Sequence, residues 1–158
     1  MARVKVFSLP YIVLLIIIGT LVSRLGTSMV IPYMTVHFIE VKHLPMFIPG
    51  AALGLSYFSQ VVGATVVKNL MRNKNDVLII RWFVLLYGIV FFVIGAISAY
   101  VNNKVLISIS ILSIFLIIGL CRSVIETNSQ VLISKSVAPQ SKSFAFSLRY
   151  VCINVGNS

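Results

Sequence analysis

Three arginines and one glutamate fall deep within long apolar stretches, where an ionised side chain is costly. Arg24 lies 14 residues after the start of the apolar run 10–39. In a helix rising about 1.5 Å per residue, that position is close to mid-bilayer. Arg122 and Glu126 are four residues apart, hence on one helix face, and Arg149 lies in the last apolar stretch. A charge at such depth costs at least about 2.5–3.5 kcal/mol, so these side chains should face protein, water or a solute.

Two interpretations of these residues are open. Arg122 and Glu126 could form a satisfied ion pair within their helix, with the polar residues 128–130 binding neighbouring helices. Alternatively, the charged groups could line a pathway for ions or solutes. The second interpretation is favoured, because ionisable side chains inside a membrane usually mark such pathways. The candidate pathway residues are Arg24, Tyr33, Arg122, Glu126, Asn128 and Arg149.

The deep charges do not balance. Three arginines and a single carboxylate leave an excess of about two positive charges, which lipid cannot neutralise cheaply. We therefore expect compensation from outside this sequence. An anionic ligand, a partner protein or more of the same protein could each supply it.

The composition identifies the solvent of the elements that carry these residues. The 158 residues are 59% hydrophobic and 10% charged, with a mean hydropathy of +1.04, so the surrounding medium should be lipid. Since lipid offers no partner to a bare backbone amide, each long apolar run should be a helix. The sequence predicts an all-α, polytopic transmembrane bundle of about five helices in a single domain, 1–158. The expected spans are 10–39, 46–67, 77–101, 105–133 and 141–158, and the pair Asn75-Asp76 is expected to cap the third.

The basic residues predict the orientation of the chain. Lys and Arg number 13, against three acidic residues, for a net charge of +10. Most of the basic residues lie in breaks between apolar runs, which argues against nucleic-acid binding. Their excess on one side of the membrane places the N-terminus in the cytoplasm. The expected location is the cell (inner) membrane. One side would carry Arg3, Lys5, Lys68, Arg72, Lys74, Lys135 and Lys142, and the other Lys42 and Lys104.

Nothing in the sequence suggests an enzyme. Cys121 and Cys152 lie in apolar segments without the spacing of metal ligands. No nucleophile and base pair stands out, and we expect no cofactor and no metal.

Several motifs resemble the major facilitator superfamily of transporters, in particular its drug:proton antiporter branch. The stretch SRLGTSMVIPYMTVHF, residues 23–38, is similar to the first-helix pattern of that branch. Arg122 stands where many such antiporters carry an arginine linked to proton coupling. The region after the fourth span is also similar to the family pattern, at Gln130–Ser134, Ala138-Pro139, Phe144–Leu148 and Asn154-x-Gly156.

The loop after the second span departs from the family pattern. The resemblance aligns Lys68 with an aspartate and Met71 with a glycine, and only Arg72 keeps the family type. In the family this aspartate belongs to a cytoplasmic charge relay, so a lysine there puts ordinary gating in question. The candidate gating residues are Lys68, Arg72 and Asp76.

The resemblance implies the N-terminal portion of a twelve-helix secondary transporter. Such a protein would move a small solute, coupled to protons, by alternating access, with efflux by antiport as the closest parallel. Glu126 would take up and release a proton, while Asn128 and Tyr33 would offer hydrogen bonds to the solute. The expected partners are lipid, the solute, protons, and either a missing C-terminal half or another membrane protein. The alternative hypothesis is a small, non-transporting membrane subunit or scaffold.

Overall fold

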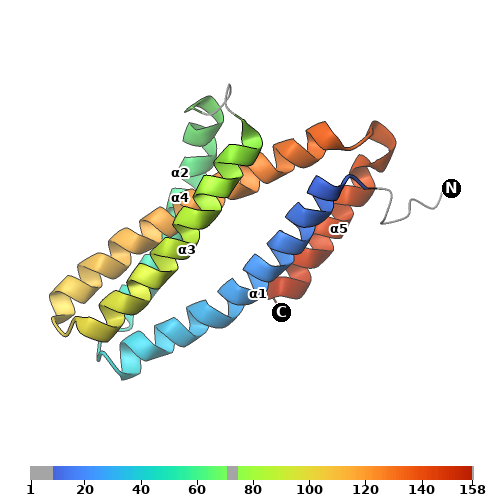
Figure 1. Ribbon diagram of the computed structural model, residues 1–158. Coiled ribbons are helices and arrows are strands. Elements are labelled where there is room, and N and C mark those ends of the chain that lie inside the picture. The colour runs from blue at the N-terminus through green and yellow to red at the C-terminus, as the bar shows by residue number, and fades with distance from the viewer. Residues whose placement is uncertain (1–8, 71–74, 158) are drawn as a thin grey trace. The chain divides into compact units, whose positions relative to one another are not determined.

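Helices make up the fold of this protein (Figure 1). The computed structural model describes residues 9–70 and 75–157, except the side chains of 66–70, and within those ranges it contains five helices and no strand. The predicted all-α class is therefore confirmed. The helices are α1 Tyr11–Glu40, α2 Phe47–Leu70, α3 Asp76–Tyr100, α4 Lys104–Ser136 and α5 Pro139–Asn157.

Four of these helices, α1 to α4, are long and apolar enough to cross a membrane, by length and composition. The 19-residue α5 begins with the polar run Pro139-Gln-Ser-Lys-Ser143 and is not among the four. Many large apolar side chains on α1 to α4 are exposed, including Met29 at 75% and Phe92 at 78%. Such surfaces are expected of helices whose outer faces contact acyl chains.

Side-chain caps begin two of the helices. Asn75 is extended and accepts a 3.0 Å hydrogen bond from the Val77 N–H, which satisfies a donor at the start of α3. This is the cap that the Asn75-Asp76 pair predicts. Asn103 accepts an equivalent 3.0 Å bond from the Val105 N–H at the start of α4. Short polar caps thus mark where apolar helices stop and connections begin.

The contacts of the chain separate into two compact units, which are described in turn. The α1/α5 unit comprises Met1–Met34 and Ser129–Ser158, and the middle unit comprises Thr35–Asn128. The single domain expected from the sequence stays a prediction.

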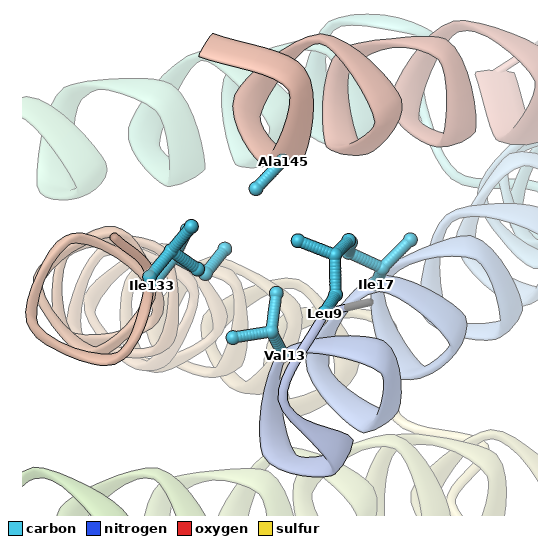
Figure 2. Packing of buried hydrophobic residues seen from close by; sticks show 6 residues of the cluster. Leu9, Val13, Ile17, Ile133 and Ala145 are labelled. Atoms are coloured by element: carbon cyan, nitrogen blue, oxygen red, sulfur yellow. The ribbon is translucent and has the colours of Figure 1, made fainter. Parts of the chain in front are cut away.

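An apolar cluster holds the α1/α5 unit together. Val13 and Ile17 of α1, Ile133 of α4 and Ala145 of α5 point toward one another (Figure 2). All four side chains are 4% exposed or less. Their spacing of one turn on α1 is the ordinary pattern of a helix stripe facing a core.

Two contacts give the register of α5 on α1. Val13 and Ala145 share the apolar cluster, and Gly156 lies against Arg24. A Cβ at Gly156 would lie 2.5 Å from the Arg24 Cβ and 3.3 Å from the Leu21 carbonyl oxygen, so only glycine fits here. Ala145 thus packs with residues 9–17 near the start of α1, and Gly156, eleven residues later on α5, lies against Arg24, further along α1. The two helices therefore run parallel.

Small residues bring α2 and α4 close together in the middle unit. Ser59 on α2 donates a 2.9 Å hydrogen bond to the Leu116 carbonyl of α4. A Cβ on Gly119 would overlap the Ser56 carbonyl and the Ser59 hydroxyl. A Cβ on Gly63 would likewise lie only 3.0 Å from the Ser123 Cβ of α4. This close approach of two backbones is typical of helices packed in lipid.

Helix α3 has an apolar and a polar contact in the middle unit. Ile79 packs with Val124 of α4, next to Phe83. Near the other end of α3, Ser98 lies 2.9 Å from the His37 Nε2 of α1. These contacts leave much of α3 exposed, including Trp82 at 67%.

Candidate functional site

Arg149 is the most deeply buried arginine described in the α1/α5 unit. It is 4% exposed and lies one turn beyond Ala145, on the α5 face that packs on α1. The parallel register places Arg149 level with Ile17, which is one turn beyond Val13. Arg149 therefore lies at the level of Ile17, at the edge of the apolar cluster.

Arg24 lies further along the same interface. It is half-buried, and its Cβ faces Gly156. In the α1/α5 register, Arg24 is seven residues beyond the level of Arg149, or about 10 Å along the helix axis. The structure thus brings two of the predicted pathway arginines to one helix pair.

Ser129 lies at this level as well, although the sequence did not single it out as a site residue. It is 4% exposed and lies one turn before Ile133 on α4. Helices α4 and α5 are joined by the short connection at 137–138 and run antiparallel. Ser129, one turn before Ile133 on α4, and Arg149, one turn after Ala145 on α5, consequently lie at the same level. The signal in the sequence was the polar run 128–130, but without the register it did not distinguish Ser129 from its neighbours.

Arg122, Glu126 and Asn128 lie on α4 in the middle unit. Arg122 and Glu126 are half-buried and share a face by their spacing of one turn. Asn128 is 6% exposed, and its amide donates a 2.9 Å hydrogen bond to the Val124 carbonyl of the same helix. This segment of α4 therefore carries polar side chains that are buried or half-buried.

Ser123 is a buried polar residue that the sequence analysis did not consider. It is 2% exposed, and its hydroxyl has no hydrogen-bond partner among the described residues. It faces Gly63 of α2, which accounts for its burial. Its small size, more than its polarity, suits this contact.

The remaining candidates lie elsewhere or outside the description. Tyr33 is 75% exposed on α1, and Asp76 is in the first turn of α3. Lys68 belongs to α2, but its side chain lies outside the described residues, as does Arg72 entirely. The candidate gating residues therefore lie partly outside the described residues. Arg81 is exposed near the start of α3.

A polar contact joins two connections at one end of the middle unit. The Lys42 ammonium donates to the Val101 carbonyl at 3.1 Å and to the Asn102 Oδ1 at 3.4 Å. The connection after α1 and the connection after α3 therefore lie at the same end, as the alternation of spanning helices requires.

One comparison with known proteins gives a similarity. Over 153 residues, the chain is 26% identical to an uncharacterized MFS-type transporter, YqjV, of Bacillus subtilis (strain 168). That similarity covers most of the chain. It includes 89% of this chain but 32% of the relative, so the chain spans about a third of the length of the protein it matches. No family model and no solved structure matches the chain.

The similarity supports the broad class suggested by the motifs. It extends to a transporter of the MFS type and does not distinguish the drug:proton antiporter branch. Together with four helices long enough to span a membrane, it indicates a multi-pass membrane protein related to transporters.

Proposed function

We propose that this chain forms part of a secondary transporter of the major facilitator type, which moves a small solute across the cell membrane. The observation that carries the proposal is the similarity to an MFS-type transporter across 89% of the chain. Ionisable side chains near the middle of α1, α4 and α5 support it, because such groups in membrane helices usually serve a transport pathway.

Proton coupling is assigned to α4. Glu126 is the single acidic residue of the sequence that lies deep within an apolar span, and Arg122 is one turn away on its face. A carboxylate that gains a proton loses its attraction for a nearby guanidinium, which changes the relative stability of two conformations. Proton uptake at Glu126 would thereby be linked to a change between inward-facing and outward-facing states.

Solute contacts are assigned to side chains with hydrogen-bonding groups around that pathway. Asn128 is buried beside the Arg122 and Glu126 segment, and Tyr33 would contribute a phenol from α1. Lys68, Arg72 and Asp76 would form the gate at the cytoplasmic end. Efflux of the solute by antiport with protons would be the finer form of this function, as in the drug:proton antiporter branch that the motifs resemble.

The test is a flux assay in cells that express the complete reading frame containing this chain. A solute panel is followed with and without a proton uncoupler, first for the unmodified protein. Glu126→Gln is expected to reduce the uncoupler-sensitive flux by about tenfold or more, while the protein is still present in the membrane fraction. Arg81→Gln is the matched control, because Arg81 is exposed near the start of α3, and it should leave the flux unchanged.

Uncoupler-sensitive flux that survives Glu126→Gln would contradict the role of this carboxylate. Flux that is absent for every solute, in a protein correctly inserted in the membrane, would favour a non-transporting subunit or scaffold instead.

A further inference from the structure

Two side chains join the end of α1 to the end of α3 in the middle unit. The His37 Nε2, in the last turn of α1, lies 2.9 Å from the Ser98 Oγ in the last turn of α3. Just beyond α1, the Lys42 ammonium donates to the Val101 carbonyl at 3.1 Å and to the Asn102 Oδ1 at 3.4 Å. We name these three hydrogen bonds the α1/α3 clasp. All five residues belong to the same unit.

The contact between His37 and Ser98 is the enclosed part of the clasp. Ser98 is 8% exposed and His37 is half-buried. The Phe38 ring, 2% exposed, meets the imidazole edge-on with 5.9 Å between the ring centroids. Because water has little access to the Ser98 hydroxyl, its hydrogen bond has to be made within the protein.

The hydrogen count of this contact favours a neutral imidazole. Among the described residues, the Ser98 hydroxyl has one hydrogen-bond partner, the His37 ring. This pairing assigns the tautomer: a neutral ring with its proton on Nδ1 accepts the hydroxyl proton at Nε2. An imidazolium carries a proton on both nitrogens and can only donate. Protonation of His37 would therefore leave the buried Ser98 hydrogen without its acceptor, which weakens the contact.

The charges around His37 have opposing effects on its protonation. The carbonyls at the end of α1 attract a cation, whereas nearby lysines repel it. Glu40, one turn further along α1, is exposed and has no ion pair among the described residues. These effects act close to water, where they are weak, so the enclosed Ser98 contact outweighs them. The first ten residues of α2 carry no ionisable side chain, and the other ionisable groups at this end of the unit are Lys42, His43, Tyr100 and Lys104.

We propose that the α1/α3 clasp is a pH-sensitive contact, closed while His37 is neutral and loosened when this side chain gains a proton. Histidine ordinarily changes charge between pH 5 and 8, so the clasp loosens toward pH 5. The Lys42 bonds do not involve the imidazole, so the two helices stay joined. The charge distribution predicts that this end of the unit lies outside, where the clasp would respond to external pH. The inference concerns the packing of α1 on α3 and does not depend on the transport function.

The test measures the separation of the two helix ends as a function of pH. The complete reading frame containing this chain, with its cysteines replaced by serine, is spin-labelled at Val41→Cys and Tyr100→Cys and placed in phosphatidylcholine nanodiscs. Both positions are exposed, at 59% and 87%, and neither takes part in the clasp. Distances between the labels are recorded by pulsed electron paramagnetic resonance from pH 5 to pH 8. The ratio of the longer-distance to the shorter-distance population is expected to rise by about two- to tenfold toward pH 5, as the loss of one hydrogen bond predicts.

Variants assign the response to His37. His37→Gln retains a hydrogen-bond acceptor but cannot titrate, so the distances should stay those of pH 8 throughout. Ser98→Ala removes the partner, so the longer distance should be populated at every pH. His43→Asn is the matched control, because His43 is exposed and asparagine tolerates the φ of 52° at that position. It should leave the pH response unchanged, as should Glu40→Gln.

The inference would be overturned if the distances did not change between pH 5 and 8, or if the helix ends came closer at pH 5. A response that survives His37→Gln would also overturn it, as would one that disappears in His43→Asn or Glu40→Gln, because another group would then control the contact. If His37→Gln does not fold, Ser98→Ala decides the question. A pH response that persists without the Ser98 hydroxyl would contradict the clasp.

Discussion

Single glycines decide how closely the helices approach one another. Gly119 on α4 and Gly156 on α5 both sit where a Cβ would collide with the neighbouring helix, whereas Gly54, Gly88 and Gly95 have no such neighbour within 4 Å. In lipid, helices gain little from the hydrophobic effect and depend on close van der Waals contact and interhelical hydrogen bonds. Gly119 serves both, because its contact lies beside the Ser59 hydrogen bond to Leu116.

Replacing Gly119 by alanine should separate α2 from α4 locally. The new methyl group would overlap the Ser56 carbonyl and the Ser59 hydroxyl, so we expect a loss of about 1–3 kcal/mol of stability. The measurement is thermal unfolding in detergent or nanodiscs. Gly88→Ala is the matched control, since it adds the same group in open space, and it should be neutral or slightly stabilising. Equal effects of the two substitutions would contradict the proposed contact.

At the scale of whole helices, the packing of α5 on α1 positions Arg24 and Arg149. Its register depends on the apolar cluster at one end and the Gly156 contact at the other. That register is what brings Ser129 and Arg149 to one level. A shift of one turn between α1 and α5 would separate Arg149 from the level of Ile17, so the register can be tested directly.

Paired cysteines can test the parallel register of α1 and α5. In a background with Cys121→Ser and Cys152→Ser, Val13→Cys combined with Ala145→Cys should cross-link efficiently on oxidation or with a short bis-maleimide, because both side chains face the same cluster. Val13→Cys combined with Tyr150→Cys should not, since Tyr150 is 68% exposed. The readout is the mobility of the cross-linked chain on a denaturing gel. Comparable yields from the two pairs would exclude this register.

For the molecule as a whole, the orientation in the membrane follows from charge. Seven basic residues are expected on the side of the N-terminus and two on the other, and positive loops remain in the cytoplasm. The Lys42 contacts with Val101 and Asn102 place the connections after α1 and α3 at the same end, as this topology requires.

Labelling of single cysteines in intact cells should reveal that topology. In the same cysteine-free background, His43→Cys and Asn102→Cys should react with an impermeant maleimide added outside, because both are exposed in connections that the charge distribution predicts to be outside. Gln140→Cys, exposed near the start of α5, should react only after the membrane is permeabilised. The opposite pattern would mean that the chain inserts with its N-terminus outside.

The spacing of apolar and polar residues was sufficient to recognise five helices, four of which are long and apolar enough to span a membrane. The expected spans differ from the observed helices by at most three residues at each end. The Asn75 cap was likewise evident from sequence. These features are local: a long apolar run in lipid must bond its own amides, and a capping side chain reaches only its own first turn. Position along a helix is also local, so the sequence places Arg24 and Arg149 far from the ends of their helices, as the bounds of α1 and α5 confirm.

Local sequence patterns do not show which helix faces contact one another. The pairing of Gly156 with Arg24, the contact of Gly119 with Ser59, and the common level of Ser129 and Arg149 all join residues more than 19 positions apart. Nearly every face of these helices is apolar, so hydropathy does not distinguish a face that packs on protein from one that contacts lipid. Only steric fit and hydrogen bonding between helices make that choice, and both depend on the folded arrangement.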